Sequence, residues 1–279
     1  MKEFVGKAYY RLLPQYLHPQ TVKESLRLWS LQRRKSHLPR YVPTTEKVLG
    51  YIIRSVDYPS FYSQYKDIFI RRIYHFDSDK PDPLIIDCGS YIGMSIIYFK
   101  HIYPQARIIG FEPDSEIFKV LEENIARNGL GSVTLVNAAL SSEEGKTTFI
   151  PDGSDGGRLV QYDLARDTSY PPIQVKKARL SNYLTEPVDF LKVNIEGAEY
   201  DVLREAGDRL RLVRQLVIEY HGFPDLPQRL HNILGLLDDY GFKYLTGCPG
   251  NESNPGGHSP FQLNDEVRYF VWVYAKHTE

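Results

Sequence analysis

Short apolar runs alternate with segments of helical spacing from residue 84 to the end of the chain. Strands are predicted at 84–88, 107–111, 133–136, 189–194 and 215–218, and helices at 94–101, 115–128, 195–206 and 226–240. Two more strands are predicted near 242–245 and 268–275. This alternation is typical of an α/β fold in which a mostly parallel sheet has helices on both faces.

The middle of the chain has a less regular pattern. Residues 145–150 predict an edge strand, and the segment 152–157 that follows is rich in glycine. Such a segment suits either a flexible loop that closes over a substrate or a plain surface loop. A further strand is predicted at 175–180.

Residues 1–80 differ from the rest, and we predict a mainly helical extension there, ahead of a single domain at 81–279. Apolar residues recur at helical spacing between Thr21 and Lys35, and basic residues end that segment, as the helix dipole favours. A turn at Tyr58-Pro59 precedes another helix or a pair of short strands. We expect the extension to cover one edge of the sheet or the mouth of the active site. If two copies of the chain associate, we expect them to do so through this extension.

The first apolar run ends in an acid and a glycine-containing turn, Asp87-Cys88-Gly89-Ser90-Tyr91-Ile92-Gly93. Open α/β sheets bind nucleotide-like ligands at such a turn, beyond the carboxyl ends of their strands. Glycine permits a sharp turn at position 89 and a close approach of a helix or ligand at position 93. The same spacing also occurs in α/β folds that bind nothing there. We predict that the cofactor is bound by Asp87, Gly89, Ser90, Tyr91 and Gly93.

The next two strands end in further polar residues. Glu112 lies 25 residues after Asp87, where an acid can accept hydrogen bonds from both ribose hydroxyls of a nucleoside. Near Asn137 and Ala138 the side chains are small enough for a flat base, and the Asn137 amide can bond to an adenine edge. The chain lacks Gly-x-Gly-x-x-Gly and Gly-Lys-Ser/Thr, so a cradle for pyrophosphate is poorly supplied. We therefore expect S-adenosylmethionine, which has no phosphate and whose positive sulfonium suits an acidic pocket.

The overall charge and the cysteines narrow the class of protein. The 34 basic and 35 acidic side chains give a formal net charge of −1, so no nucleic-acid partner is expected. We find no apolar run long enough to cross a bilayer and no secretion signal, so we expect no membrane partner. Cys88 and Cys248 lie far apart and outside metal-ligand spacing, which suits a reducing, cytoplasmic location.

Four segments of the chain resemble the FkbM family of S-adenosylmethionine-dependent methyltransferases. They are Asp87–Gly93, Phe111–Pro113, Leu191–Glu199 and Ile218–His221, within a similarity that covers roughly residues 84–245. The resemblance implies a Rossmann-like class I methyltransferase, with a seven-stranded sheet whose last strand is antiparallel. It also implies methylation of a hydroxyl on a sugar or natural product, with Pro113 and Asn194 beside the cofactor. At Asn194 the family commonly has an aspartate, so this chain has one charge fewer there.

The ends of the three strands expected at the centre of the sheet supply the candidate catalytic residues. Methyl transfer to a hydroxyl needs an aligned acceptor oxygen and a base for its proton. We predict His221 as the base, because a neutral imidazole with a pKa of about 6.5 accepts a proton near neutral pH. Glu219 or Glu196 would orient the ring or the hydroxyl. A simpler interpretation is that His221 caps a strand end and that the acids at 196 and 199 only complement a helix dipole.

Other interpretations of these residues stay open. Asn194, Glu196, Glu219 and His221 carry enough oxygen and nitrogen to hold magnesium, but without a dense aspartate cluster we do not favour a metal. Lys192 lies in an apolar strand, where pairing with an acid is expected. The leading function is an O-methyltransferase for a carbohydrate or glycosylated small molecule. The alternatives are a non-catalytic, cofactor-binding interaction platform and a nicotinamide-dependent oxidoreductase, which the missing third glycine disfavours.

Overall fold

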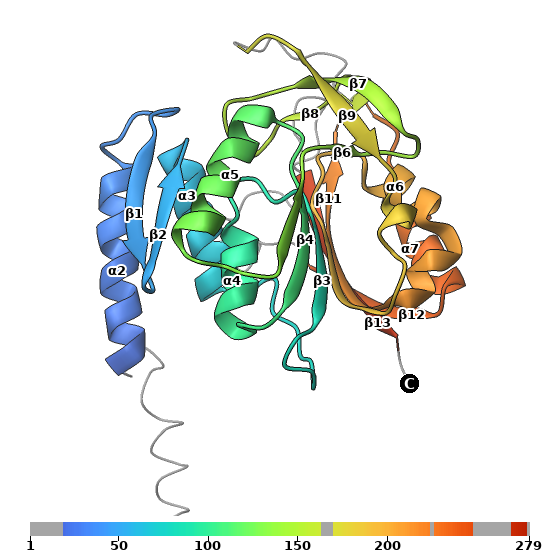
Figure 1. Cartoon of the computed structure of the whole chain (residues 1–279), viewed down its shortest axis with the longest axis horizontal. Coiled ribbons are helices and arrows are strands. Elements are labelled where there is room, and N and C mark those ends of the chain that lie inside the picture. The colour runs from blue at the N-terminus through green and yellow to red at the C-terminus, as the bar shows by residue number, and fades with distance from the viewer. Residues whose placement is uncertain (1–18, 163–169, 224–225, 248–268, 278–279) are drawn as a thin grey trace, which may run out of the picture.

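The computed structural model describes residues 19–162, 170–223, 226–247 and 269–277, and it is built around a seven-stranded sheet (Figure 1). The strand order is β12-β13-β11-β10-β3-β4-β5, and β13 runs antiparallel to both of its neighbours. The predicted α/β fold with an antiparallel last strand is therefore confirmed. The strands are β3 (Leu84–Cys88), β4 (Arg107–Phe111), β5 (Val133–Val136), β10 (Val188–Val193), β11 (Val213–Gly222), β12 (Phe242–Gly247) and β13 (Tyr269–His277). Residues 1–18 of the predicted extension, Cys248 and Arg268 lie outside the described residues.

Helices cover both faces of the main sheet, with α4 (Met94–Ile102) and α5 (Ser115–Arg127) on one face and α6 (Glu199–Ala206) and α7 (Leu230–Asp239) on the other (Figure 1). Neighbouring residues of a strand therefore enter different cores: Ile85 packs with α4 and α5, whereas Ile86 packs with α6 and α7. Because both faces of the central strands are buried, these strands are mostly apolar, which made them visible in the sequence. Across the described ranges, no helix has the length and apolar character needed to cross a membrane.

Two predicted boundaries at the carboxyl edge of the sheet were wrong. Strand β11 continues to Gly222 because β13 pairs with it, so His221 opposes Phe270 within the strand. Helix α6 begins at Glu199, because the residues before it form a turn in which Glu196 and Gly197 both have positive φ. Both differences affect the side chains with candidate chemistry.

A second sheet, which the sequence did not predict, lies above the main one (Figure 1). Its order is β6-β9-β7-β8, so the strand predicted as an edge at 145–150 lies between two neighbours. The prediction failed because two of the partner strands are only two residues long and have no periodicity of their own. The strands are β6 (Ala139–Leu140), β7 (Gly145–Ile150), β8 (Arg158–Leu159) and β9 (Ile173–Ala178).

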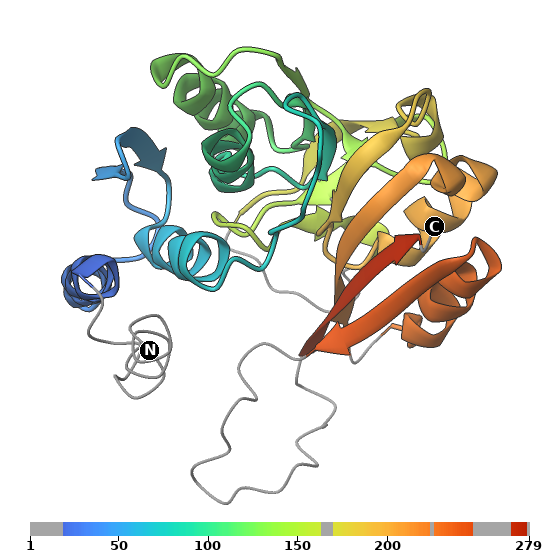
Figure 2. The ribbon, with the colours of Figure 1, turned by 90° about the horizontal axis from the view of Figure 1, so that it is seen from below.

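The segment before residue 81 contains α2 (Pro19–Lys35), where a helix was predicted, and α3 (Tyr58–Gln64), which begins at the residues predicted as a turn. Between them lies an unpredicted hairpin of β1 (Thr44–Val48) and β2 (Tyr51–Ser55), and a π-helical turn, Tyr65–Ile70, follows α3 (Figure 2). Aromatic side chains of α3 and the π-helical turn belong to the same hydrophobic cluster as α4. This part of the segment therefore shares a core with the sheet.

Asn124 of α5 and Asn128, the C-cap residue of that helix, hold the hairpin against the main domain. Asn124 is fully buried; its Oδ1 accepts a hydrogen bond from the Arg54 backbone N–H at 2.7 Å, and its Nδ2 donates to the carbonyls of Arg54 at 2.9 Å and Ile92 at 2.8 Å. One turn later, Asn128 bonds in the same way to the backbone of Ile52, at 2.8 and 2.9 Å, but in a more exposed position. The two amides thus replace a neighbouring strand along β2.

We expect Asn124→Ala to lower the free energy of unfolding by about 2–4 kcal/mol, because it leaves buried backbone groups without partners. Asn128→Ala is the matched control, and water can replace its exposed bonds, so its loss should be about 1 kcal/mol or less. Urea unfolding followed by circular dichroism measures both. Equal losses in the two variants would show that burial does not set the strength of this contact.

Candidate active site

A cavity of about 430 Å³ opens at the carboxyl ends of β3, β4, β10 and β11. That volume lies within the range of small-molecule sites, and the position is where open α/β sheets bind ligands. Of the sequence-predicted residues, the cavity is lined by Gly89, Ser90, Tyr91, Glu112, Pro113, Ala138, Asn194, Glu196, Glu219 and His221. Asp87, Gly93 and Asn137 do not line it.

The turn after β3 passes directly against the end of β10. Gly89 has a φ of 93°, and a Cβ atom there would lie 1.9 Å from the Asn194 carbonyl oxygen. No side chain fits in that space, so glycine is required for this close approach. Tyr91, two residues later, also has a positive φ, 48°, which is uncommon for a bulky residue.

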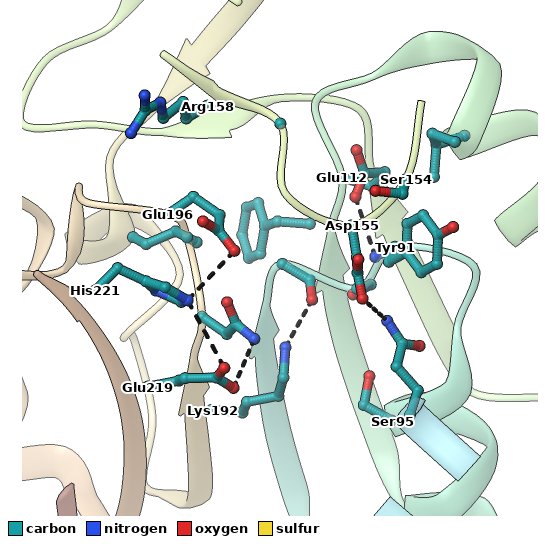
Figure 3. A pocket seen from close by; sticks show the side chains of 18 of the residues that line it. Tyr91, Ser95, Glu112, Ser154, Asp155, Arg158, Lys192, Glu196, Glu219 and His221 are labelled. Atoms are coloured by element: carbon teal, nitrogen blue, oxygen red, sulfur yellow. Dashed lines mark hydrogen bonds and ion pairs between the residues drawn. The ribbon is translucent and has the colours of Figure 1, made fainter. Parts of the chain in front are cut away.

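Asp87 lies beneath this turn and is fully buried. Its Oδ1 is 2.8 Å from Lys192 Nζ, and its Oδ2 accepts hydrogen bonds from the hydroxyls of Ser95 at 2.5 Å and Ser90 at 3.0 Å. Lys192 Nζ also donates to the Gly89 carbonyl at 2.6 Å (Figure 3). The predicted pairing of Lys192 with an acid is confirmed. Because no part of Asp87 is exposed, the geometry favours a role in anchoring the turn over the predicted contact with the cofactor.

Glu112 lies on the wall of the cavity, on the side of β4. Its Oε2 accepts a hydrogen bond from the Tyr91 backbone N–H at 3.0 Å, and its Oε1 accepts one from the Asp114 N–H at 2.9 Å. Burial raises the pKa of this carboxyl to about 8. The two hydrogen bonds thus hold the side chain in one orientation. Hydroxyl groups of a ligand would donate further hydrogen bonds to the charged carboxylate, which lacks them here.

The structure places Asn137 and Gly93 in supporting positions. Asn137 Nδ2 donates to the carbonyls of Glu112 at 2.9 Å and Pro113 at 3.1 Å, so its amide holds the turn after β4 instead of facing a base. Gly93 precedes α4, and a Cβ there would approach Leu121 Cδ1 to 2.7 Å. Of the two uses considered for Gly93, the structure therefore shows close helix packing.

His221 lies among three carboxylates on the opposite side of the cavity from Glu112, and Figure 3 shows two of them, Glu196 and Glu219, beside its ring. Its Nδ1 is 3.3 Å from Glu199 Oε1, and its Nε2 is 3.3 Å from Glu196 Oε1 and 3.7 Å from Glu219 Oε1. Burial lowers the pKa of the imidazole, but the three acids outweigh burial and raise it to about 9. His221 is therefore positively charged at neutral pH, and the predicted role of a neutral base is not favoured by this geometry.

The two acids of the Glu-Gly-Ala-Glu segment have different environments. Glu199 is fully buried and accepts hydrogen bonds from the backbone N–H groups of Ile195 at 3.3 Å and Gly197 at 3.1 Å, so it shapes the turn. Glu196 lines the cavity and has a φ of 53°. Glu196 thus faces the cavity, where a ligand can contact it. Glu199 stabilises the turn that contains Glu196.

Glu219 is the more accessible carboxylate beside His221, since 16% of its side chain is exposed against 9% for Glu196. Asn194 Nδ2 donates to Glu219 Oε2 at 2.9 Å (Figure 3). Burial and the neighbouring Glu196 raise the pKa of Glu219 to about 7, although the His221 charge lowers it. An aspartate at position 194 would bring a second negative charge to Glu219, whereas the amide of Asn194 donates a hydrogen bond.

Metal coordination finds no support in this cluster. Within the described ranges, His, Cys, Asp and Glu side chains form no group of three or more with the geometry of a metal site. The cluster instead has an internal cation, the imidazolium of His221, among its acids.

The sequence did not identify the wall of the cavity that comes from the segment before residue 81. Eight residues between Ser63 and Tyr74 line the cavity, and seven residues between Pro151 and Leu159 line it as well. The second of these segments is held to α3, because the Asp155 carboxylate accepts hydrogen bonds from Ser60 Oγ and Gln64 Nε2, both at 2.9 Å. The sequence before residue 80 is rich in tyrosine and phenylalanine, which is a signal of such packing. The expectation that the segment lies at the mouth of the active site agrees with this position.

The strand order, the antiparallel β13 and a cavity at the carboxyl edge define a class I methyltransferase fold. A family model described as the methyltransferase FkbM domain matches residues 87–244. The chain therefore belongs to the FkbM family of methyltransferases.

Three relatives show the range of similarity. The chain is 32% identical over 212 residues to Methyltransferase sdnD of Sordaria araneosa, which covers 64% of this chain and 80% of that protein. It is 28% identical over 160 residues to 2-O-methyltransferase NoeI of Sinorhizobium fredii, with 51% and 65% covered. It is also 28% identical over 218 residues to 31-O-demethyl-FK506 methyltransferase FkbM of Streptomyces tacrolimicus, with 65% and 82% covered.

We expect Asp87→Asn to lower the free energy of unfolding by about 3–5 kcal/mol, because Lys192 would keep a buried charge without its ionic partner. The double variant Asp87→Asn/Lys192→Met removes both charges and should recover much of that loss. Urea unfolding of the two variants and the wild type measures the difference. A double variant no more stable than Asp87→Asn would contradict the anchoring role of this pair.

Proposed function

We propose that the protein is an S-adenosylmethionine-dependent O-methyltransferase that acts on a hydroxyl of a carbohydrate or glycosylated small molecule. The observation that carries this proposal is one cavity with two different sides. A glycine turn and Glu112 lie on one side, and a carboxylate beside a charged histidine lies on the other. The names of two relatives, a 2-O-methyltransferase and a 31-O-demethyl-FK506 methyltransferase, support oxygen as the acceptor atom.

The cofactor side fits a nucleoside without phosphate. Glu112 is already oriented by two backbone N–H groups, and each of its oxygens retains a lone pair for a ribose hydroxyl. The backbone of Gly89, Ser90 and Tyr91 offers a close approach, and Ala138 leaves room for a flat base. When bound, S-adenosylmethionine supplies an activated methyl group to the acceptor oxygen.

The acceptor side needs a group that removes the hydroxyl proton, and we assign that role to Glu219. Its carboxylate is partly exposed, and its pKa of about 7 lets it accept a proton near neutral pH. The positive charge of His221 keeps Glu219 ionised, and Glu199 holds the imidazole from its other nitrogen. Glu196 is placed to accept a hydrogen bond from a second hydroxyl of the acceptor. The proposed base is thus Glu219, whereas the sequence predicted His221. Both residues were among the candidate catalytic residues.

Binding of the cofactor is tested by calorimetry with S-adenosylmethionine. Glu112→Ala should lower the affinity on the order of 100-fold, because the hydrogen bonds to both ribose hydroxyls are lost. Glu116→Ala, an exposed acid of α5 outside the cavity, is the control and should bind as the wild type does. Unchanged affinity in Glu112→Ala would refute the ribose assignment. A parallel fluorescence titration with NADH should show no binding.

The pH dependence of methyl transfer tests the base. The kcat/KM for the acceptor should rise as pH increases through about 7, because Glu219 must lose its proton before it can accept another. His221→Asn should move this midpoint to higher pH, since the imidazolium that lowers the Glu219 pKa is gone. His231→Asn, on α7 and away from the cavity, should leave the midpoint unchanged. A profile that does not depend on Glu219 or His221 would exclude this assignment.

Single-turnover transfer of a labelled methyl group to a panel of sugars and glycosides separates an enzyme from a non-catalytic platform. Transfer that depends on Glu219 supports the proposal. Tight binding of S-adenosylmethionine without transfer to any member of the panel would favour the platform.

A further inference from the structure

The family domain begins at residue 87, yet the side chain of Tyr74, from before that point, reaches Glu219, the carboxylate proposed as the base. Tyr74 follows the π-helical turn, lines the cavity and is 4% exposed. Its hydroxyl donates to Glu219 Oε2 at 3.5 Å. The contact joins residues 145 positions apart in the sequence.

Aromatic packing fixes the path of the chain around Tyr74. Its ring stacks on Trp272 of β13, with centroids 5.8 Å apart and planes at 20°. Trp272 opposes Glu219 in the pairing of β13 with β11, so the stack brings the tyrosine hydroxyl next to that carboxylate. Two residues later, Phe76 stacks on Phe190 of β10 at 4.5 Å. The segment is thus attached to two strands of the main sheet.

The Tyr74 contact leaves one oxygen of Glu219 for chemistry. Tyr74 and Asn194 both donate to Oε2, whereas among the described residues the ion-pair contact of Oε1 is with the more distant His221, at 3.7 Å. Burial and the adjacent Glu219 raise the pKa of the Tyr74 phenol well above its usual value, so the hydroxyl remains a donor at any working pH. A carboxylate held by donors on one oxygen presents the other to an incoming hydroxyl.

Tyr74 also contacts the cofactor side of the cavity. Lys192 Nζ lies 5.4 Å from the centre of the tyrosine ring, within the range of a cation–π contact. The same ammonium group donates to the Gly89 carbonyl in the turn after β3. The ring and the hydroxyl of Tyr74 therefore serve different halves of the cavity.

We infer that Tyr74 is a positioning residue for Glu219, and that the segment before the family domain is part of the active site. The inference rests on the proposed function for its catalytic meaning. The hydroxyl of Tyr74 orients the proton acceptor, and its ring supports the cofactor turn through Lys192.

Tyr74→Phe removes the hydroxyl and keeps the ring, so its effect should be confined to Glu219. With a methyl glycoside as acceptor, kcat at pH 6.5 should fall about tenfold, as expected for a lost hydrogen bond to a charged group. The KM for S-adenosylmethionine should stay unchanged. Tyr74→Leu removes the ring as well and should also weaken S-adenosylmethionine in calorimetry. Tyr98→Phe, a buried tyrosine of the same hydrophobic cluster that lies outside the cavity, is the matched control.

A second measurement does not depend on turnover. The Glu219 carboxyl carbon can be titrated by NMR in glutamate-labelled protein and assigned by its absence in Glu219→Gln. Its midpoint should rise in Tyr74→Phe, because a donor to the charged form is lost. With 3,5-difluorotyrosine at position 74, a stronger donor, the midpoint should fall. These variants leave the other groups that act on Glu219 unchanged. Those groups are Lys192 and Asn194 from β10, Glu196 after β10, His221 from β11, Tyr274 from β13 and Asp155 after β7. Asp87 of β3, which faces Tyr74, is unchanged as well.

The outcomes separate this inference from the proposed function. An unchanged midpoint and kcat in Tyr74→Phe, or an equal loss in Tyr98→Phe, would overturn the role of Tyr74. Wild-type protein that transfers no methyl group would overturn the proposed function, while the NMR titration would still decide whether Tyr74 holds Glu219.

Discussion

The rest of the active site depends on the ion pair between Lys192 and Asp87. The two residues are direct partners in the pairing of the central strands β10 and β3, and both are fully or almost fully buried. A buried pair of this kind is stable only when further hydrogen bonds satisfy both charges. Here two serine hydroxyls bond to the carboxylate and the Gly89 carbonyl bonds to the ammonium group. The pair therefore fixes the glycine turn on one side of the cavity, and through the Tyr74 ring it contacts the other.

Much of the fold could be predicted because burial on both faces leaves a strong pattern. The strand from Arg107 to Phe111 was predicted with its observed limits, and α5 was predicted to within one residue. Prediction failed where pairing with a distant strand decides the outcome. The extension of β11 to Gly222 depends on β13, and the hairpin at 44–55 is held by Asn124 of α5 and by Asn128 at the end of that helix.

The sequence predicted which residues would gather at the candidate site better than it predicted what each of them does there. Glycine turns and strand ends are local features, so the sequence indicated which side chains would gather at the carboxyl edge. Their roles depend on surroundings that come from several elements. Asp87 pairs with Lys192 of the neighbouring strand, and three carboxylates raise the pKa of His221. Tyr74 approaches from a segment that carries no motif, so no local pattern marked it.

Tyr91 and Glu196 hold left-handed backbone conformations on opposite sides of the cavity, although neither is a glycine. Such conformations cost about 1–3 kcal/mol each, and they persist only where the surrounding structure enforces them. Replacement by glycine would relieve this strain, yet it would also remove two side chains that line the cavity. A gain in backbone stability at these two positions would therefore come with a loss of side-chain surface in the cavity.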